Sequence, residues 1–127
     1  MATDKILLSI DDEESISQVI QIALEMMAGW TVLIAHSGVE GIMMAETQQP
    51  DVILLDVEMP VMDGLETLHK LQANPATQHI PVIFLTCKPD FVNHRQLGKL
   101  GAKAVIAKPF DPLTLAHRVE YALDGRK

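Results

Sequence analysis

The sequence predicts an α/β protein with a five-stranded parallel sheet in the order 2-1-3-4-5 and helices on both faces. Two observations support this prediction. Short apolar runs alternate with amphipathic helical patterns along the whole chain, which is typical of strands joined by right-handed helical crossovers. The run at Val52–Leu55 is apolar at every position, as expected of a central parallel strand that is buried on both faces.

The first strand and helix are the best marked. Ile6–Ile10 is the first apolar run, and apolar residues then recur at 3–4 spacing through Ile16–Met27, as in a helix with one buried face. Ser15 and Gln18 stand at capping-box spacing at its start, and Gly29 follows its end. We therefore predict a helix that begins at Ser15 and is closed by Gly29.

The remaining elements follow the same alternation. The later strands are predicted at Thr31–Ala35, Val52–Leu55, Val82–Leu85 and Ala104–Ala107. The later helices are predicted from Ser37, with Glu40 as its capping partner, to Pro50; over Leu65–Leu71; within Phe91–Leu100; and from Asp111-Pro112 to about Leu123.

The composition indicates a single soluble domain over residues 1–127. Seventeen acidic residues against ten basic residues give a net charge of −7, which argues against a direct nucleic-acid partner because such binders need a basic face. No apolar run is long enough to cross a membrane, and no segment is typical of a secretory signal. The one cysteine, Cys87, cannot form an internal disulfide. We expect a cytoplasmic protein without a membrane partner.

Polar residues stand directly after four of the predicted strands. In parallel sheets of this order, ligands bind beyond the carboxyl ends of the strands. The residues at these positions are Asp11, Asp12, Asp56, Thr86 and Lys108. Three carboxylates in one pocket repel one another unless a cation compensates, and a hard divalent ion such as Mg²⁺ prefers oxygen ligands. With a hydroxyl and an ammonium beside them, the set fits phosphoryl transfer to a carboxylate nucleophile.

Each residue also has an ordinary structural interpretation. An acidic run such as Asp11–Glu14 favours the first turn of a helix, and Thr86 or Lys108 alone would be an unremarkable polar residue. Asp56 is different, because an acid after four buried aliphatic residues is costly without a partner. Five such residues at equivalent strand ends therefore favour a functional site. Trp30, before the second strand, is expected to pack at the opposite end of the sheet.

The chain resembles the receiver domain of two-component response regulators, a flavodoxin-like three-layer fold, over about residues 4–123. The resemblance rests on four segments: Asp11-Asp12, Leu55–Gly64 with the sequence LDVEMPVMDG, Leu85-Thr86 and Ala107–Phe110. By that resemblance, Asp56 is the phosphoacceptor, Thr86 donates a hydrogen bond to a phosphoryl oxygen, and Lys108 pairs with another.

The resemblance also implies a metal site, partners and an output surface. Mg²⁺, or Mn²⁺ in its place, would be held by Asp11, Asp12, Asp56 and the backbone carbonyl of Glu58. The Lys108–Pro109 peptide would be cis. A histidine kinase or a histidine phosphotransfer protein would supply the phosphoryl group. A downstream protein would bind the face formed by the fourth helix, the strand 104–107 and the last helix. The sequence does not decide between a monomer and a homodimer.

Two positions near the expected site depart from the family's usual pattern, and two others carry opposite charges. The switch position that often carries Tyr or Phe is Val105 here, which has no ring to turn. Cys87 stands where the family commonly has a smaller residue, and its simplest interpretation is a small half-buried side chain. Glu58 and Lys88 lie two residues past Asp56 and Thr86. We expect these opposite charges to pair across the mouth of the site and to slow hydrolysis of the acyl phosphate.

Three other functions compete with a stand-alone receiver that catalyses only its own phosphotransfer and slow autodephosphorylation. The chain could be a receiver excised from a larger regulator, which its length fits equally well. It could be a small phosphatase with an aspartyl-phosphate intermediate, although such enzymes typically carry Asp-x-Asp after the first strand. A flavin-binding module would need a phosphate loop after the first strand, where this chain has four acids.

Overall fold

The computed structural model describes residues 5–88 and 98–124, which form three layers. The central layer is a parallel sheet in the order β2-β1-β3-β4-β5. Its strands are β1 (Ile6–Ile10), β2 (Thr31–Ala35), β3 (Val52–Asp56), β4 (Val82–Thr86) and β5 (Ala104–Ala107). The predicted fold class and strand order are confirmed. Asp56 and Thr86 are themselves the last residues of β3 and β4. The backbone hydrogen bonds of the sheet therefore fix the Cα positions from which both side chains extend.

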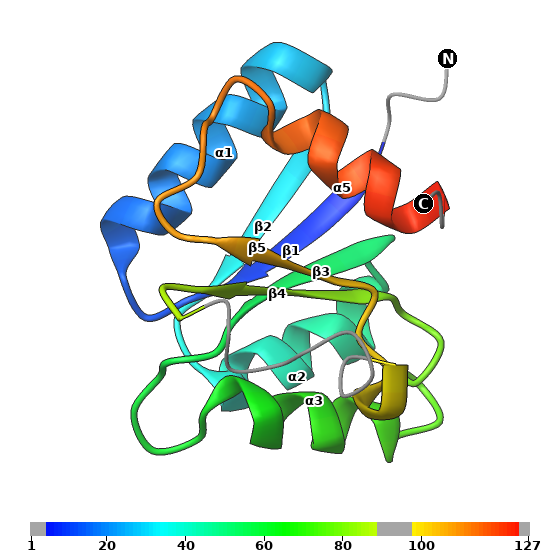
Figure 1. Cartoon of the computed structure of the whole chain (residues 1–127). Helices are drawn as coiled ribbons and strands as arrows, with labels where there is room; N and C mark the ends of the chain where they lie inside the picture. Colours follow the sequence, from blue (N-terminus) through cyan, green and yellow to red (C-terminus); the bar gives the residue numbers. More distant parts are fainter. Residues whose placement is uncertain (1–4, 89–97, 125–127) are drawn as a thin grey trace.

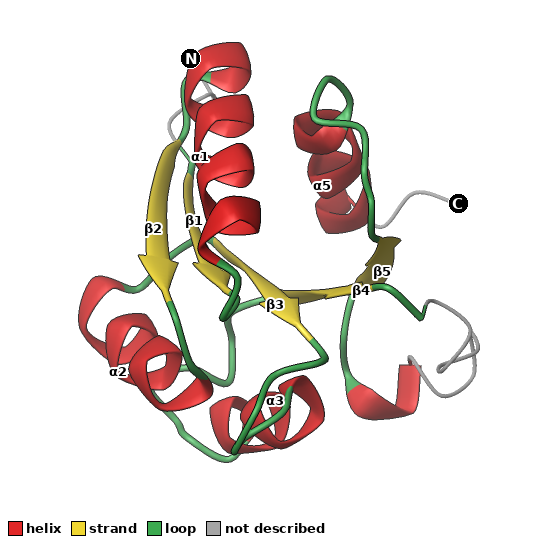
Figure 2. Ribbon diagram, turned by 90° about the vertical axis from the view of Figure 1, so that its left-hand side faces the viewer, coloured by secondary structure: helices red, strands yellow, loops and turns green. Residues whose placement is uncertain are grey.

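Helices cover both faces of the sheet. They are α1 (Glu14–Ala28), α2 (Gly38–Gln48), α3 (Gly64–Gln72) and α5 (Leu115–Asp124). Figure 1 shows α1 and α5 on one face and α2 and α3 on the other, and Figure 2 shows the same two layers from the side. Most of the predicted helix within Phe91–Leu100 lies outside the described residues, and only its last part, residues 98–100, is described and helical.

Two apolar cores hold the layers together, one on each face of the sheet. Alternate residues of β1 point to opposite faces: Leu8 joins the core under α3 together with Leu68, and Leu7 joins the core under α1 together with Ile20. β3 is buried at every position, as predicted from its unbroken apolar run. Trp30, directly before β2, is also buried, so the expectation that it packs at the far end of the sheet is confirmed.

Three helix ends test the capping predictions. Ser37 Oγ accepts a hydrogen bond from the backbone N–H of Glu40 at 3.1 Å, so the cap of α2 is confirmed. Gly29 closes α1 in the left-handed conformation, with φ +72°. The start of α1 was predicted wrongly. The helix begins at Glu14 and Ser15 lies inside it, because Asp11 Oδ1 already accepts from the backbone N–H of Glu13 at 2.9 Å and turns the chain into the helix.

The start of α5 differs in a similar way. Asp111 Oδ1 accepts from the backbone N–H of Leu113 at 2.9 Å, and the backbone N–H of Thr114 donates to the carbonyl of Asp111 at 3.1 Å. Asp111 therefore caps a separate turn, and the helix begins at Leu115.

Candidate functional site

The predicted acidic residues converge at the carboxyl end of the sheet. β1 and β3 are neighbours, so Asp11 follows one strand where Asp56 ends the next. Asp11, Asp12 and Asp56 each offer one carboxylate oxygen, and these three atoms lie within 4.8 Å of one another. Asp11 and Asp56 are each only 1% exposed, whereas Asp12 is exposed. The pocket thus has two buried carboxylates at its base and one at its rim.

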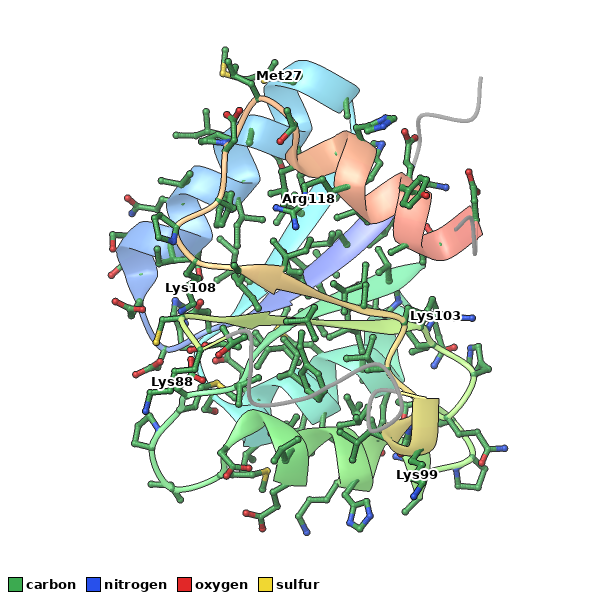
Figure 3. The ribbon with its side chains drawn as sticks, viewed as in Figure 1. Met27, Lys88, Lys99, Lys103, Lys108 and Arg118 are labelled. Carbon is green, nitrogen blue, oxygen red and sulfur yellow. The ribbon has the colours of Figure 1, made fainter. Side chains whose placement is uncertain are left out.

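Lys108 supplies the positive charge of the pocket. Its Nζ lies 3.2 Å from Asp56 Oδ1 and 3.4 Å from Asp11 Oδ2. It also lies 3.2 Å from Glu13 Oε1. Figure 3 shows Lys108 and Lys88 at the same end of the sheet, with Lys103 at the opposite end. Glu13 was missed as a site residue because, in the sequence, it is only one acid in a run of four.

The electrostatics of the pocket follow from this geometry. Burial, and then the negative charge of Asp11, raise the pKa of Asp56 from 3.8 to about 7 against the opposing effect of Lys108. Burial also raises the pKa of Asp11. Burial alone would lower the pKa of Lys108, but the charges of Asp11 and Asp56 outweigh it and hold that pKa above its ordinary value. One lysine therefore does not fully compensate the buried carboxylates.

The donor set fits a hard divalent cation. Asp56 Oδ1 is engaged by Lys108, and it also accepts from the backbone N–H of Glu58 at 3.3 Å. Asp56 Oδ2 is buried and has no hydrogen-bond partner within the described part of the chain. A buried anionic oxygen without a partner is costly. Mg²⁺ binds through carboxylate oxygens and retains waters, which matches an unpaired buried oxygen beside an exposed carboxylate.

The loop between β3 and α3 is fixed against the end of β3. The backbone N–H of Gly64 donates to the carbonyl of Val57 at 2.9 Å. A Cβ at Gly64 would lie 2.5 Å from the Asp56 carbonyl oxygen, so only glycine allows this approach. Asp63 Oδ1 accepts from the backbone N–H of Glu66 at 2.9 Å and starts α3. Asp63 and Gly64 thus hold the backbone behind Asp56 in its observed conformation.

The prediction that Glu58 and Lys88 form an ion pair is wrong. The Glu58 carboxylate instead accepts from the Thr86 hydroxyl at 2.5 Å and from the backbone N–H of Cys87 at 3.3 Å, and no Glu58–Lys88 ion pair occurs within residues 5–88. An exposed ion pair contributes only about 0–1 kcal/mol, and a hydroxyl and an N–H lie closer. Cys87 is exposed, which also corrects its expected half-burial.

Strand β5 brings Lys108 to the site. The backbone N–H of Lys108 donates to the carbonyl of Thr86 at 2.8 Å, which continues the hydrogen bonding between β4 and β5 by one residue. The predicted cis peptide between Lys108 and Pro109 is present. Val105 is half-buried on β5 and packs against the core under α3, two strands from Asp56.

Comparison with known proteins identifies the family. The profile of the response regulator receiver domain matches residues 7–120. This chain belongs to that family. Receiver domains act in two-component signalling and are not metabolic enzymes, so membership of this family supports neither the phosphatase nor the flavin-binding alternative.

Individual relatives agree with this assignment. The receiver is 38% identical to the alkaline phosphatase synthesis transcriptional regulatory protein PhoP of Bacillus subtilis, over 94% of this chain and 49% of that protein. It is 37% identical to the phosphate regulon transcriptional regulatory protein PhoB of Pseudomonas aeruginosa, over 94% of this chain and 52% of that protein. The chain therefore spans about half the length of these curated relatives.

Solved structures of receivers superpose closely. The chemotaxis protein CheY4 of Vibrio cholerae is similar with a TM-score of 0.85 and 30% identity, over 94% of this chain and 98% of that one. The receiver domain of sensor histidine kinase PA1611 from Pseudomonas aeruginosa has a TM-score of 0.82 and 25% identity, over 95% of this chain and 98% of that one. That structure holds a magnesium ion in its active site cleft. Among the described residues, no helix of this receiver could span a membrane.

Proposed function

We propose that this receiver is the phosphoacceptor of a two-component phosphorelay, with Asp56 as the nucleophile. The observation that best supports this proposal is the burial and hydrogen bonding of the Asp56 carboxylate. It is 1% exposed, its Oδ1 is held by Lys108 at 3.2 Å, and its Oδ2 has no hydrogen-bond partner among the residues that the structure describes. A fixed carboxylate with one free oxygen, beside an acidic cation site, is arranged for attack on a phosphoryl group.

The step forms one bond and breaks one. A carboxylate oxygen of Asp56 attacks phosphorus, the P–N bond to the donor histidine breaks, and the imidazole leaves with the electron pair. Lys108 stabilises charge on a phosphoryl oxygen, and Thr86 donates a hydrogen bond to another. Asp11, Asp12, Asp56 and the backbone carbonyl of Glu58 are the proposed ligands of Mg²⁺ or Mn²⁺. A bound divalent cation would supply further neutralisation of phosphoryl charge.

Phosphorylation by a small donor tests the assignment. Wild-type protein incubated with labelled acetyl phosphate and Mg²⁺ should take up label that is lost on treatment with base, as expected of an acyl phosphate. Asp56→Asn should take up none, and Asp51→Asn, at the other end of β3, should label like the wild type. Equal labelling of Asp56→Asn would show that another residue is the nucleophile.

The partners follow from the same proposal. A histidine kinase or a histidine phosphotransfer protein would be the donor, and output would pass through a protein bound to the face that includes β5 and α5. The described part of that face has a groove of about 590 Å³ whose lining includes Lys103, His117, Arg118 and Tyr121. Its basic and aromatic lining suits a protein surface that carries acids. The stand-alone organisation, the cytoplasmic location and the choice between monomer and homodimer stay predictions.

A further inference from the structure

Glu58 holds the hydrogen-bond donors at the end of β4. Its Oε2 accepts from the hydroxyl of Thr86 at 2.5 Å. Its Oε1 accepts from the backbone N–H of Cys87 at 3.3 Å, and the Cys87 thiol lies 3.6 Å from the same oxygen. One side chain, two residues past the proposed nucleophile, therefore engages the hydroxyl, the amide and the thiol on the neighbouring strand end.

The proton of the Thr86 hydroxyl is fully used by this contact. A hydroxyl has a single O–H to donate. Thr86 Oγ1 accepts from the backbone N–H of Lys88 at 2.9 Å, so its own proton is directed to Glu58. Thr86 is completely buried, so its hydroxyl is not open to solvent water as an alternative partner. In this arrangement the hydroxyl cannot also donate to a phosphoryl oxygen on Asp56.

We propose that Glu58 is an internal competitor of the phosphoryl group, a positioning residue that occupies the Thr86 and Cys87 donors until phosphorylation displaces it. This inference rests on the proposed function of Asp56. A carboxylate and a phosphoryl group both present anionic oxygens to such donors, and charge-assisted hydrogen bonds of this kind are the strong ones. The two groups cannot use the same proton, so one must leave when the other arrives.

Glu58 is able to leave. Its side chain is exposed, and it makes no ion pair within residues 5–88 or 98–124 that would hold it over the site. Once displaced, its carboxylate returns to water, where a charge is well solvated. The contact therefore lowers phosphoryl affinity without blocking the site permanently, and its removal should speed phosphorylation and tighten binding of a phosphoryl mimic.

Two variants separate the contact from the charge. Glu58→Gln removes the negative charge and leaves only a weaker neutral acceptor near Thr86. Glu58→Asp retains the charge, but its side chain is one methylene shorter and falls short of the Thr86 hydroxyl. If the hydrogen bond is the competitor, both variants relieve it. If repulsion between Glu58 and the phosphoryl group is the cause, only Glu58→Gln does so.

The test measures two quantities: the rate constant for labelling by acetyl phosphate with Mg²⁺, and the affinity for beryllofluoride followed by the backbone amide signal of Cys87. Both Glu58 variants should label about tenfold faster and bind beryllofluoride about tenfold tighter, equivalent to about 1.4 kcal/mol. Glu120→Gln, an exposed charge removal on α5, should match the wild type. In a Thr86→Ala background, Glu58→Gln should add much less than it does alone, because the two residues act as one pair.

Three results would overturn the inference: unchanged or slower labelling of Glu58→Gln, a wild-type rate for Glu58→Asp, or a full gain from Glu58→Gln in the Thr86→Ala background. Failure of the proposed function is distinguishable from these. It would appear as labelling of Asp56→Asn at the wild-type rate, whatever the Glu58 variants do.

Discussion

The buried charge of Asp56 should make the metal-free receiver less stable as pH rises. The pKa of Asp56 is raised from 3.8 to about 7 in the folded protein, first by burial and then by Asp11. An acid with a raised folded pKa favours folding most when it is neutral, so its contribution is fully present below pH 3.8 and is lost as pH rises to about 7. At about 1.4 kcal/mol for each pH unit, ionised Asp56 lowers the free energy of unfolding by about 4 kcal/mol.

Asp56→Asn removes this charge and keeps the shape of the side chain. Lys108 retains Asp11 and Glu13 as partners, so the substitution leaves no isolated cation. With part of the gain offset by the lost contact to Lys108, we expect the variant to be about 2–4 kcal/mol more stable than the wild type at pH 8. For a domain of this size that is roughly a 10 °C rise in Tm. The difference should shrink steadily from pH 7 toward pH 4.

The assay is thermal or urea unfolding in a chelator, measured from pH 4 to pH 8. Asp12→Asn serves as the matched control, because it removes the same charge from the same pocket at an exposed position. It should gain much less and show a weaker pH dependence. An Asp56→Asn protein no more stable than the wild type at pH 8, or equal gains in the two variants, would refute the reasoning from burial.

Four further outcomes follow from the structure. Mg²⁺ should raise the Tm of the wild type by binding the folded state, and Asp12→Ala should lose most of that rise; an unchanged rise would place the cation elsewhere. Trp30 fluorescence should not respond to Mg²⁺, because Trp30 lies at the other end of the sheet. Gly64→Ala should cost about 2–3 kcal/mol in urea unfolding, since its Cβ would meet the Asp56 carbonyl oxygen at 2.5 Å. Beryllofluoride should shift amide signals after Thr86 far more than those around Val105; the reverse pattern would contradict a switch without a ring.

The layers, the strand order and the placement of the acidic residues could be predicted from the sequence, because they depend on periodic burial and on a topological rule. Val52–Leu55 is apolar at every position, and a run this short within an alternating strand–helix pattern favours a strand that is buried on both faces. Once the order of the strands is known, Asp11 and Asp56 must meet at one edge of the sheet. Backbone geometry then carries Lys108 to the same place.

Side-chain contacts at the rim could not be predicted in this way. Opposite charge suggested that Glu58 pairs with Lys88, yet the structure joins Glu58 to a hydroxyl and a backbone N–H. Exposed ion pairs are weak, so rotamers and local donors decide such contacts. The predicted starts of α1 and α5 were wrong for a related reason. Asp11 and Asp111 each accept from a backbone N–H two residues on, and these turns shift the helix starts that Ser15 and Pro112 were expected to mark.

The resting site therefore combines two opposing features. Its buried carboxylates favour a cation, while Glu58 adds a further acid and takes the donors that an anion would need. Lys108 alone does not reverse the local charge, since three acids already contact it. Free phosphate, which brings no bond energy, would have to overcome both the repulsion and the Glu58 contact. A donor that transfers its phosphoryl group covalently to Asp56 meets the same repulsion and the same Glu58 contact, but the bond that breaks in the donor supplies free energy to offset them. If Asp56 and Glu58 act as proposed, we therefore expect the receiver to respond to a phosphorylated donor and not to free phosphate.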